Sequence, residues 1–226
     1  MKGKNFIIIG GNSGIGGSLA ALLREAEANV FVYSRNEPGS SKLDVTAAEL
    51  ELKNLPDLIH GLVYCPGSIT LKPFHRLGTE DFLKDYEINF LGAVKVLHAC
   101  LRNLKQAKGA SVVLFSTVAV QTGLGFHASI ASAKGAVEGL VRSLAAEWAS
   151  SGIRVNAVAP SLTDTPLAGQ LLGTPEKQEA AAKRHPLGRY GKASDSANAA
   201  FYLLSEQAGW VTGQVLKVDG GMSAIR

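Results

Sequence analysis

The sequence has few cysteines and no block of like charge, and both facts narrow the class of protein. Its 226 residues include two cysteines, Cys65 and Cys100, each in an apolar run without the CxxC or Cys/His spacing of a metal site. We therefore predict no metal, and two reduced thiols in a cytosolic core. Positive charges exceed negative ones by four, but they are scattered, which argues against nucleic acid as a partner.

Long apolar segments are also missing. No stretch is long enough to cross a bilayer, and residues 1–5 lead directly into a strand-like run without the organisation of a signal peptide. We expect a cytoplasmic protein that contacts no membrane. Hydrophobic residues make up 46% of the chain, which is enough for the core of one α/β domain of this length.

Strand and helix patterns alternate along the whole chain. Short β-branched or apolar runs predict strands at residues 6–9, 30–33, 60–64, 111–115, 153–158 and 214–218. Apolar positions at helical spacing predict helices at residues 19–26, 79–104, 128–150 and 194–204, the last capped by Ser194. This alternation predicts an α/β fold of one domain, residues 1–226, with a doubly wound parallel sheet and helices on both faces.

One segment, residues 163–190, interrupts this alternation. It is rich in Ala, Gln, Lys and Glu, which makes it too polar for the core, and it is too long for a plain loop. We predict that it forms a helical lid beside a ligand cleft. Nothing in its sequence identifies a substrate.

A glycine-rich turn follows the first predicted strand and precedes a helix. Its sequence is Gly10-Gly11-Asn12-Ser13-Gly14-Ile15-Gly16. In this context Gly10 permits a tight turn, Gly14 lets the backbone approach a phosphate, and Gly16 lets the helix pack on the strand. The free N–H groups and the positive dipole end of the helix would face a pyrophosphate. The turn therefore predicts a dinucleotide-binding site.

The end of the second predicted strand distinguishes the two nicotinamide cofactors. An acidic residue there would bind a free ribose 2′-hydroxyl and repel a 2′-phosphate. This strand ends in Ser34 and Arg35, and a guanidinium fits a phosphate with paired hydrogen bonds. We therefore predict NADP(H) as the preferred cofactor, with NAD(H) as the alternative. The plainer interpretation of Arg35 is a solvated surface base.

Five further segments, taken with this turn, resemble motifs of the short-chain dehydrogenase/reductase family. They are Leu43-Asp44-Val45, Ile88-Asn89-Phe90, Val155-Asn156-Ala157-Val158-Ala159-Pro160 with Thr163 and Thr165 beyond it, Gly213-Gln214, and Val218-Asp219-Gly220-Gly221. The resemblance covers nearly the whole chain and implies a Rossmann-like sheet of about seven strands. It also implies an NAD(P)-dependent oxidoreductase, and a homodimer or homotetramer formed through the two long helices.

The same resemblance implies roles for single residues. Asp44 and Val45 would hold the adenine ring, and Asn89 stands at the family's active-site asparagine. Pro160, Thr163 and Thr165 would contact the nicotinamide end of the cofactor. From the sequence alone, Asn89 is equally a structural hydrogen-bonding residue in an apolar segment, and Asp44 is equally a cap for residues 46–48.

Two positions depart from the family pattern. The Asn-Ala-Gly turn after the fourth strand is here Cys65-Pro66-Gly67, so the glycine is kept and the asparagine is not. In the catalytic YxxxK motif, Lys134 is in place but Ile130 occupies the tyrosine position. The family's catalytic serine, thirteen residues before that tyrosine, corresponds to Thr117, next to Ser116.

Ile130 has no proton to give to a carbonyl oxygen. In the first of three interpretations, the chain is an oxidoreductase acting on a small carbonyl or alcohol, and His127, one helical turn earlier, is the substitute acid. Thr117 would orient the carbonyl, while Asn89 and Lys134 would relay a proton from water. Tyr64 is a weaker candidate acid.

Two other interpretations remain. The chain could bind NADP(H) without turnover, as a sensor or scaffold, or its substrate could need no protein acid at this position, as in the reduction of a polarised C=C bond. The site residues also have plainer roles. His127 would cap the helix or lie on the surface, and Thr117 would simply end a strand. Lys134 would be a surface lysine, although it shares a helix face with apolar residues, where a buried ammonium needs a partner such as ribose.

Overall fold

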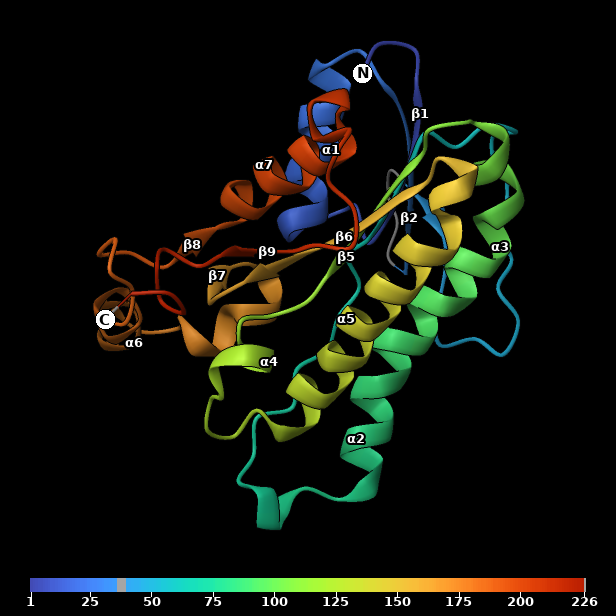
Figure 1. The fold of residues 1–226 in the computed structure, drawn as a ribbon. Helices are drawn as coiled ribbons and strands as arrows, with labels where there is room; N and C mark the ends of the chain where they lie inside the picture. The colour runs from blue at the N-terminus through green and yellow to red at the C-terminus, as the bar shows by residue number, and fades with distance from the viewer. Residues whose placement is uncertain (36–39, 226) are drawn as a thin grey trace.

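The fold is built on a parallel sheet of seven strands. A computed structural model describes residues 1–35 and 40–225, and its ribbon is shown in Figure 1. The strands are β1 (Asn5–Ile9), β2 (Asn29–Ser34), β3 (Ser41–Lys42), β4 (Gly61–Tyr64), β5 (Ser111–Phe115), β6 (Arg154–Pro160) and β9 (Val215–Val218). They pair in the order β3-β2-β1-β4-β5-β6-β9, and all the pairs are parallel. The predicted doubly wound α/β sheet is therefore confirmed.

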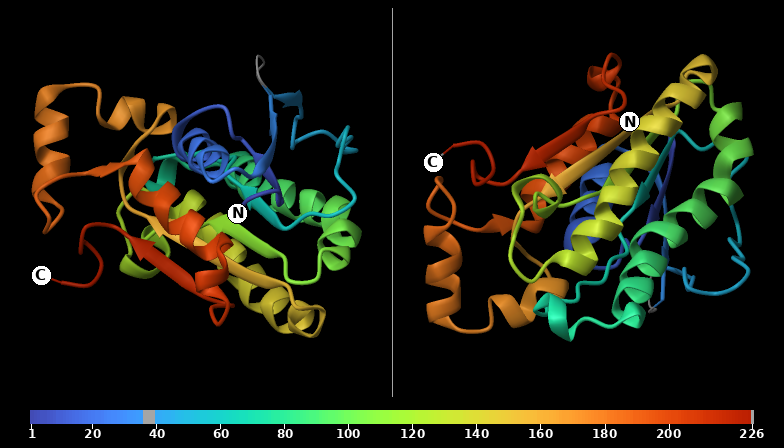
Figure 2. Two further views of the ribbon diagram at one scale, coloured as in Figure 1. Left: turned by 90° about the horizontal axis from the view of Figure 1, so that it is seen from above. Right: turned by 60° about the horizontal axis from the view of Figure 1, so that its bottom comes forward.

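Helices cover both faces of this sheet. The α-helices are α1 (Gly14–Glu25), α2 (Thr79–Tyr86), α3 (Gly92–Gln106), α4 (Ala119–Thr122), α5 (Ala128–Trp148), α6 (Pro175–Lys183) and α7 (Ala193–Leu204). Figures 1 and 2 show α1 and α7 on one face and α3 and α5 on the other. Within the described residues, no helix is both long and apolar enough to cross a membrane.

Alternate side chains of each central strand enter two separate cores. In β1, Phe6 and Ile8 pack in the core that includes residues of α1 and α7, whereas Ile7 and Ile9 pack in the core that includes residues of α3 and α5. Successive strand residues point to opposite faces of a sheet, so a strand that is covered on both sides is apolar throughout. This explains why residues 6–9 of β1 are all apolar.

The predicted helix over residues 79–104 is continuous, but it is not uniform. A π-helical turn, η2 (Glu87–Leu91), separates α2 from α3 and contains Asn89. The Asn89 Nδ2 group donates a 2.8 Å hydrogen bond to the Asp85 carbonyl oxygen, four residues earlier. The Asn89 side chain thus takes part in the backbone hydrogen-bond pattern of the helix, as side chains do at many helix irregularities. π-helical turns are frequent at functional sites.

Two helix starts differ from the sequence prediction. α1 begins at Gly14, five positions before the predicted start at residue 19, because the glycine turn leads directly into the helix. Ser194 does not cap the helix that follows, so that prediction is wrong. The N-cap is Lys192, whose backbone N–H donates to Asp195 Oδ2 at 2.7 Å. A carboxylate three residues into the helix satisfies the free N–H group in place of a serine hydroxyl.

The segment 163–190 contains a small substructure beside the main sheet. Strand β7 (Thr163–Asp164) pairs with β8 (Gly191–Lys192), and between them lie η4 (Pro166–Leu171) and α6. Ala168, Leu172 and Ala181 form its own small core. In Figure 2, α6 lies at one end of the molecule, apart from the helices that cover the sheet. The helical content agrees with the prediction, and the role of a lid stays a prediction.

Arg154 of β6 ties the sheet to the end of α7. Its guanidinium donates hydrogen bonds to the carbonyl oxygens of Leu203 (2.8 Å), Val211 (3.3 Å) and Ser205 (3.1 Å). Each of these carbonyl oxygens also accepts from one other group, namely Ser111 Oγ, Asn156 Nδ2 and the Ala208 N–H, so Arg154 adds a charged donor to groups that are already paired. Burial lowers the pKa of Arg154, with a smaller opposing effect of Tyr202.

We expect Arg154→Met to destabilise the protein by about 2 kcal/mol, because three half-buried carbonyl groups lose their charged donor while the side-chain stem is kept. Equilibrium unfolding in urea measures the change. Arg102→Met, at an exposed position on α3, is the matched control and should change stability by less than about 0.5 kcal/mol. Equal effects of the two substitutions would contradict the role assigned to Arg154.

Candidate active site

Except for Tyr64, the weaker candidate acid, the residues predicted for the cofactor and for catalysis all line one cleft. The cleft has a volume of about 770 Å³ and is lined by residues at the carboxyl ends of β1, β4, β5 and β6. Its lining includes Gly10, Asn12, Ser13, Gly14, Ile15, Gly16, Ser34, Arg35, Asp44, Val45, Gly67, Asn89, Thr117, His127, Lys134, Pro160, Thr163 and Thr165. The chain order of the strands reverses between β1 and β4, which is where ligand clefts form in doubly wound sheets.

The glycine turn has the close approaches that its sequence predicts. Gly10 and Gly14 have φ angles of 76° and 54°, in the left-handed region that favours glycine. A Cβ atom on Gly16 would lie 2.3 Å from the Gly10 carbonyl oxygen, so no larger residue fits without moving the turn. The Ser13 side chain makes no capping hydrogen bond with α1. The first residues of α1, Gly14, Ile15 and Gly16, line the cleft, and the turn fits a pyrophosphate.

The end of the cleft beside β2 contains Ser34, Arg35 and Asp44. Asp44 Oδ1 accepts hydrogen bonds from the Thr46 backbone N–H (2.9 Å) and the Thr46 hydroxyl (2.7 Å). These bonds, followed by the positive charges of Arg35 and Lys95, lower the pKa of Asp44. The structure thus shows the capping role that the sequence left open, and Asp44 also belongs to the cleft lining, as Arg35 does.

At the opposite end of the cleft, the position of the family tyrosine is apolar and closed. Ile130 lines the cleft and is 4% exposed. Tyr64 does not replace the missing phenol, because it is 2% exposed and its hydroxyl donates to the Ile88 carbonyl oxygen. Burial raises the pKa of Tyr64 far above its usual value. Tyr64 is therefore a structural residue, and its candidacy as an acid is wrong.

Asn89 makes hydrogen bonds within the fold and also lines the cleft. Its Nδ2 group donates to the Asp85 carbonyl oxygen, and it lies within 3.3 Å of the Ser68 carbonyl oxygen and 3.1 Å of the Ser68 hydroxyl. Its Oδ1 atom is buried without a hydrogen-bond partner among the residues described, close to Gly67. A buried acceptor without a partner is rare, and in a cleft lining it fits a donor from a ligand or water.

Lys134 is buried at 8% exposure, so the surface-lysine alternative is wrong. Burial lowers its pKa from 10.5 to about 8, while the Cys65 thiol and the Asp85 carboxylate act in the opposite direction. No hydrogen bond from its ammonium is found within residues 1–35 and 40–225. The hydroxyls of a nicotinamide ribose would supply such partners, so the residue fits the group that the family binds.

His127 is held in one tautomer at the edge of the cleft. Its Nδ1 atom lies 2.7 Å from the Gly125 carbonyl oxygen, which only accepts, so Nδ1 carries a hydrogen. His127 is the N-cap residue of α5, but its side chain makes no capping bond with that helix. The His127 side chain therefore caps no N–H group of α5, and no hydrogen bond of its Nε2 atom is found within the described residues.

Thr117 follows β5 and lines the cleft, where its hydroxyl accepts a 3.3 Å hydrogen bond from the Ala119 backbone N–H. The neighbouring Ser116 also lines the cleft, but it donates to the buried Glu138 carboxylate at 2.7 Å. Thr117 therefore keeps the donor function of its hydroxyl for a ligand, and Ser116 does not.

Three polar groupings at this site were missed by the sequence interpretation. Ser129 and Ser68 donate to the buried Asp85 carboxylate at 2.7 and 2.6 Å. The Ser161 hydroxyl lies 2.6 Å from His185 Nε2, and both residues line the cleft. Glu138 is the third. Two of these groupings include a polar residue of the buried face of α5, where Ser129, Lys134 and Glu138 lie. The sequence could have indicated them, because polar residues there occupy positions that the apolar spacing predicts to be buried.

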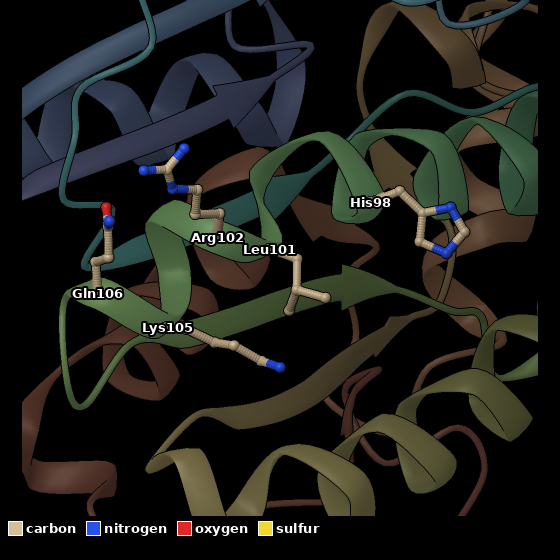
Figure 3. A pocket seen from close by; sticks show the side chains of 5 residues that line it. All are labelled: His98, Leu101, Arg102, Lys105 and Gln106. Atoms are coloured by element: carbon tan, nitrogen blue, oxygen red, sulfur yellow. The ribbon is translucent and has the colours of Figure 1, made fainter.

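A second depression lies on one face of α3, as Figure 3 shows. It is lined by His98, Leu101, Arg102, Lys105 and Gln106. None of these residues lines the main cleft. Within the part of the chain that the structure describes, no group of three or more His, Cys, Asp or Glu side chains could hold a metal ion.

The fold and the cleft define a dinucleotide-binding protein of the Rossmann class, and comparison with known proteins gives the family. A family model described as enoyl-(acyl carrier protein) reductase matches residues 45–223. The 2-(S)-hydroxypropyl-CoM dehydrogenase 3 of Xanthobacter autotrophicus is 32% identical over 251 residues, which is 100% of this chain and 98% of that protein. The chain belongs to the short-chain dehydrogenase/reductase family and is an oxidoreductase.

Two other similar proteins bear on the site. The inactive 2-(S)-hydroxypropyl-CoM dehydrogenase 2 of the same organism is 38% identical over 169 residues, which is 73% of this chain and 74% of that protein. The structure of a putative 2-deoxy-D-gluconate 3-dehydrogenase from Agrobacterium tumefaciens with bound NADP has a TM-score of 0.90 and 27% identity, and it covers 98% of this chain and 97% of that one. The first is named as inactive, and the second was solved with the phosphorylated cofactor.

We expect Lys134→Met to raise the free energy of unfolding at pH 7 by on the order of 2 kcal/mol. Lys134 has a pKa of about 8 in the folded state and 10.5 as a free side chain. Between these two pH values the folded state binds fewer protons than the unfolded state, so its stability rises with lower proton concentration. Below about pH 8 Lys134 is charged in both states, and its buried charge lowers the free energy of unfolding. Urea unfolding of both proteins at about pH 7 and above pH 10.5 measures this difference. A gain that does not shrink at the higher pH, or a loss of stability at pH 7, would contradict it.

Proposed function

We propose that this protein is an NADPH-preferring oxidoreductase that transfers hydride to or from a small carbonyl or alcohol substrate, with His127 in place of the usual tyrosine. The observation that carries the proposal is the shared cleft, which joins the glycine turn, Arg35, Lys134 and His127. The family relatives are named as dehydrogenases and reductases, which supports the reaction type.

Preference for NADPH is supported by the end of β2. Ser34 and Arg35 line the cleft, and residues 29–35, the described part of this strand and its end, include no Asp or Glu. The solved relative from Agrobacterium tumefaciens contains NADP, which adds support from the family. A guanidinium binds a 2′-phosphate with paired, charge-assisted hydrogen bonds.

Replacing Arg35 should separate the two cofactors. We expect Arg35→Ala to raise the Kd for NADPH by about 10- to 100-fold and to change the Kd for NADH by less than about threefold, because one charge-assisted phosphate contact is lost. Titration followed by cofactor fluorescence measures both constants. Arg24→Ala, at an exposed position of α1 outside the cleft, is the control. An equal loss for both cofactors would contradict the phosphate contact.

Bound NADPH would supply hydride to the carbonyl carbon, and the residues of the chain would supply the proton and the geometry. Lys134 would hold the nicotinamide ribose, and the Thr117 hydroxyl would orient the carbonyl oxygen. The oxygen takes a proton from Nε2–H of the His127 imidazolium as the alcohol forms. His127 is left neutral with its hydrogen on Nδ1, where the Gly125 carbonyl holds it. Solvent then returns the proton to Nε2 at the cleft edge.

His127 should control the rate without controlling cofactor affinity. We expect His127→Gln to lower kcat by about 100-fold or more, since a positioned acid typically contributes this much, and to leave the Kd for NADPH within about twofold of the wild-type value. NADPH oxidation with a panel of ketones measures the rate. The control is His98→Gln, at an exposed position of α3 outside the cleft. A full rate in His127→Gln would remove histidine from the mechanism.

A second candidate function is binding of NADP(H) without turnover. Ile130 at the acid position and the 38% identity to a relative named as inactive favour it. A single-turnover experiment with NADPH bound to excess protein separates the two functions. Oxidation by any ketone or enoyl compound supports the enzyme. Stable NADPH across both substrate types supports the sensor or scaffold. Oxidation by enoyl compounds alone would indicate C=C reduction, in line with the description of the matching family model.

The proposal includes a homodimer or homotetramer formed through the long helices. Along α2 and η2, Leu83 is 63% exposed and Leu91 is 39% exposed. Exposed apolar side chains that recur along a helix are typical of an interface. The depression on α3 that Figure 3 shows lies on the same continuous helix, which is formed by α2, η2 and α3.

A further inference from the structure

Ser161 and His185 form a hydrogen-bonded pair in the cleft lining, and the proposed reduction uses neither of them. Ser161 follows β6 at the carboxyl edge of the sheet, and His185 follows α6. The Ser161 hydroxyl oxygen lies 2.6 Å from His185 Nε2, and both residues line the cleft. His185 is 4% exposed, whereas Ser161 is partly exposed. A buried imidazole therefore holds a serine that solvent and ligands can reach.

The end of α6 fixes the tautomer of His185. Its Nδ1 atom lies 2.7 Å from the Ala181 carbonyl oxygen, which only accepts, so Nδ1 carries a hydrogen. In the neutral imidazole Nε2 is then an acceptor, and the Ser161 hydroxyl donates to it. Ala181 belongs to the last turn of α6, where the helix dipole is negative and favours a cation. The same carbonyl therefore orients His185 as a base and stabilises the imidazolium that forms when it accepts a proton.

A donor for a developing oxyanion lies next to the serine along the chain. Leu162 lies between β6 and β7 and lines the cleft. Within residues 1–35 and 40–225 its backbone N–H has no acceptor, while its carbonyl oxygen accepts from the Gly191 N–H at 2.9 Å. In hydrolases with a nucleophilic serine after a strand, the N–H of the following residue is a donor of the oxyanion hole. The Arg184 guanidinium, also in the cleft lining, carries further donors.

The contacts of Ser161 hold its hydroxyl in place. The Ser161 N–H donates to the Val218 carbonyl oxygen of β9 at 3.3 Å, and the Thr163 hydroxyl donates to the Ser161 carbonyl oxygen at 2.9 Å. Met222 Sδ lies 3.1 Å from Ser161 Oγ. Met222 and Leu162 are thus apolar neighbours of the serine in the cleft lining. A nucleophile in this environment suits an ester with a short apolar acyl group.

We propose that Ser161 and His185 give this protein a second activity, the hydrolysis of short-chain carboxylic esters through an acyl-enzyme. The Ser161 oxygen attacks the ester carbonyl carbon while His185 Nε2 takes the hydroxyl proton. The bond from the carbonyl carbon to the alcohol oxygen then breaks, and the alcohol leaves with the proton from Nε2. Water attacks the Ser161 ester with His185 again as the base, which releases the carboxylic acid and the free serine.

This reaction consumes one ester and one water and needs no oxidant or reductant. It does not rest on the proposed function, because neither a nicotinamide cofactor nor His127 takes part in it. The two activities would share the cleft, but they use different residues of its lining.

The direct test is the hydrolysis of p-nitrophenyl acetate and p-nitrophenyl butyrate by the purified protein without cofactor. We expect a burst of p-nitrophenol of about one equivalent per chain, which is the kinetic signature of an acyl-enzyme. Ser161→Ala should abolish the burst. His185→Gln should slow it by about 100-fold or more, because a positioned base typically contributes this much.

Covalent labelling identifies the nucleophile and needs only the wild-type protein, so it decides the question even if the His185 variant does not fold. We expect a fluorophosphonate probe, read by peptide mass spectrometry, to label Ser161. The folded His185→Gln variant should be labelled about 100-fold more slowly. Wild-type protein that carries no label on Ser161 would overturn the proposal.

The matched controls are Ser132→Ala and His98→Gln. Both residues are exposed, on α5 and α3, and neither lines the cleft. The burst and the labelling of Ser161 should keep their wild-type rates in both variants. A burst that persists in Ser161→Ala, or that falls equally in the controls, would overturn the proposal, because surface groups also react with activated esters.

The double variant Ser161→Ala/His185→Gln tests whether the two residues act as one unit. Its residual rate should equal that of Ser161→Ala alone, since losses within one unit do not multiply. A further loss in the double variant would contradict the pair. Absence of hydrolysis in a protein that oxidises NADPH would overturn the hydrolase alone, whereas hydrolysis by a protein that binds no NADPH would overturn only the proposed function.

Discussion

The burial of the Lys134 ammonium group is the constraint on which the rest of the candidate site depends, because burial disfavours its charge. Burial lowers its pKa to about 8, so at neutral pH the ammonium stays mostly charged, at a cost in folding stability. The hydroxyls of a cofactor ribose would supply hydrogen-bond acceptors for this ammonium. Strongly shifted pKa values of this kind cluster at functional sites, where they are kept at the expense of stability.

The fold could be predicted from the sequence because its signals are local. A buried strand such as β1 is apolar throughout, and a glycine turn followed by a helix has one common use in a parallel sheet. Element boundaries were less predictable. Ser194 is a good N-cap residue by composition, but Asp195 satisfies the N–H group of Lys192 instead. Two-residue strands such as β7 and β8 carry too few residues for any periodic signal.

The site was only partly predictable, for a physical reason. Residues that contact a cofactor lie at the carboxyl ends of strands, so their positions follow from the fold, and all of those predicted line one cleft. The Asp85 network could not be found in this way. Its partner Ser129 lies 44 residues away along the chain and Ser68 lies 17 residues away, so the contacts depend on how α2, α5 and the loop after β4 pack. The π-turn at Asn89 depends on the same packing.

The measurement that tests the central claim most directly is the crystal structure of the protein with NADP⁺. The account predicts the pyrophosphate at the N-terminus of α1, the 2′-phosphate against Ser34 and Arg35, and the nicotinamide ribose within hydrogen-bonding distance of Lys134 Nζ, with the His127 ring edge facing the space above the nicotinamide. Density for the cofactor outside this cleft, or a bound cofactor whose ribose leaves Lys134 without a hydrogen bond, would contradict it.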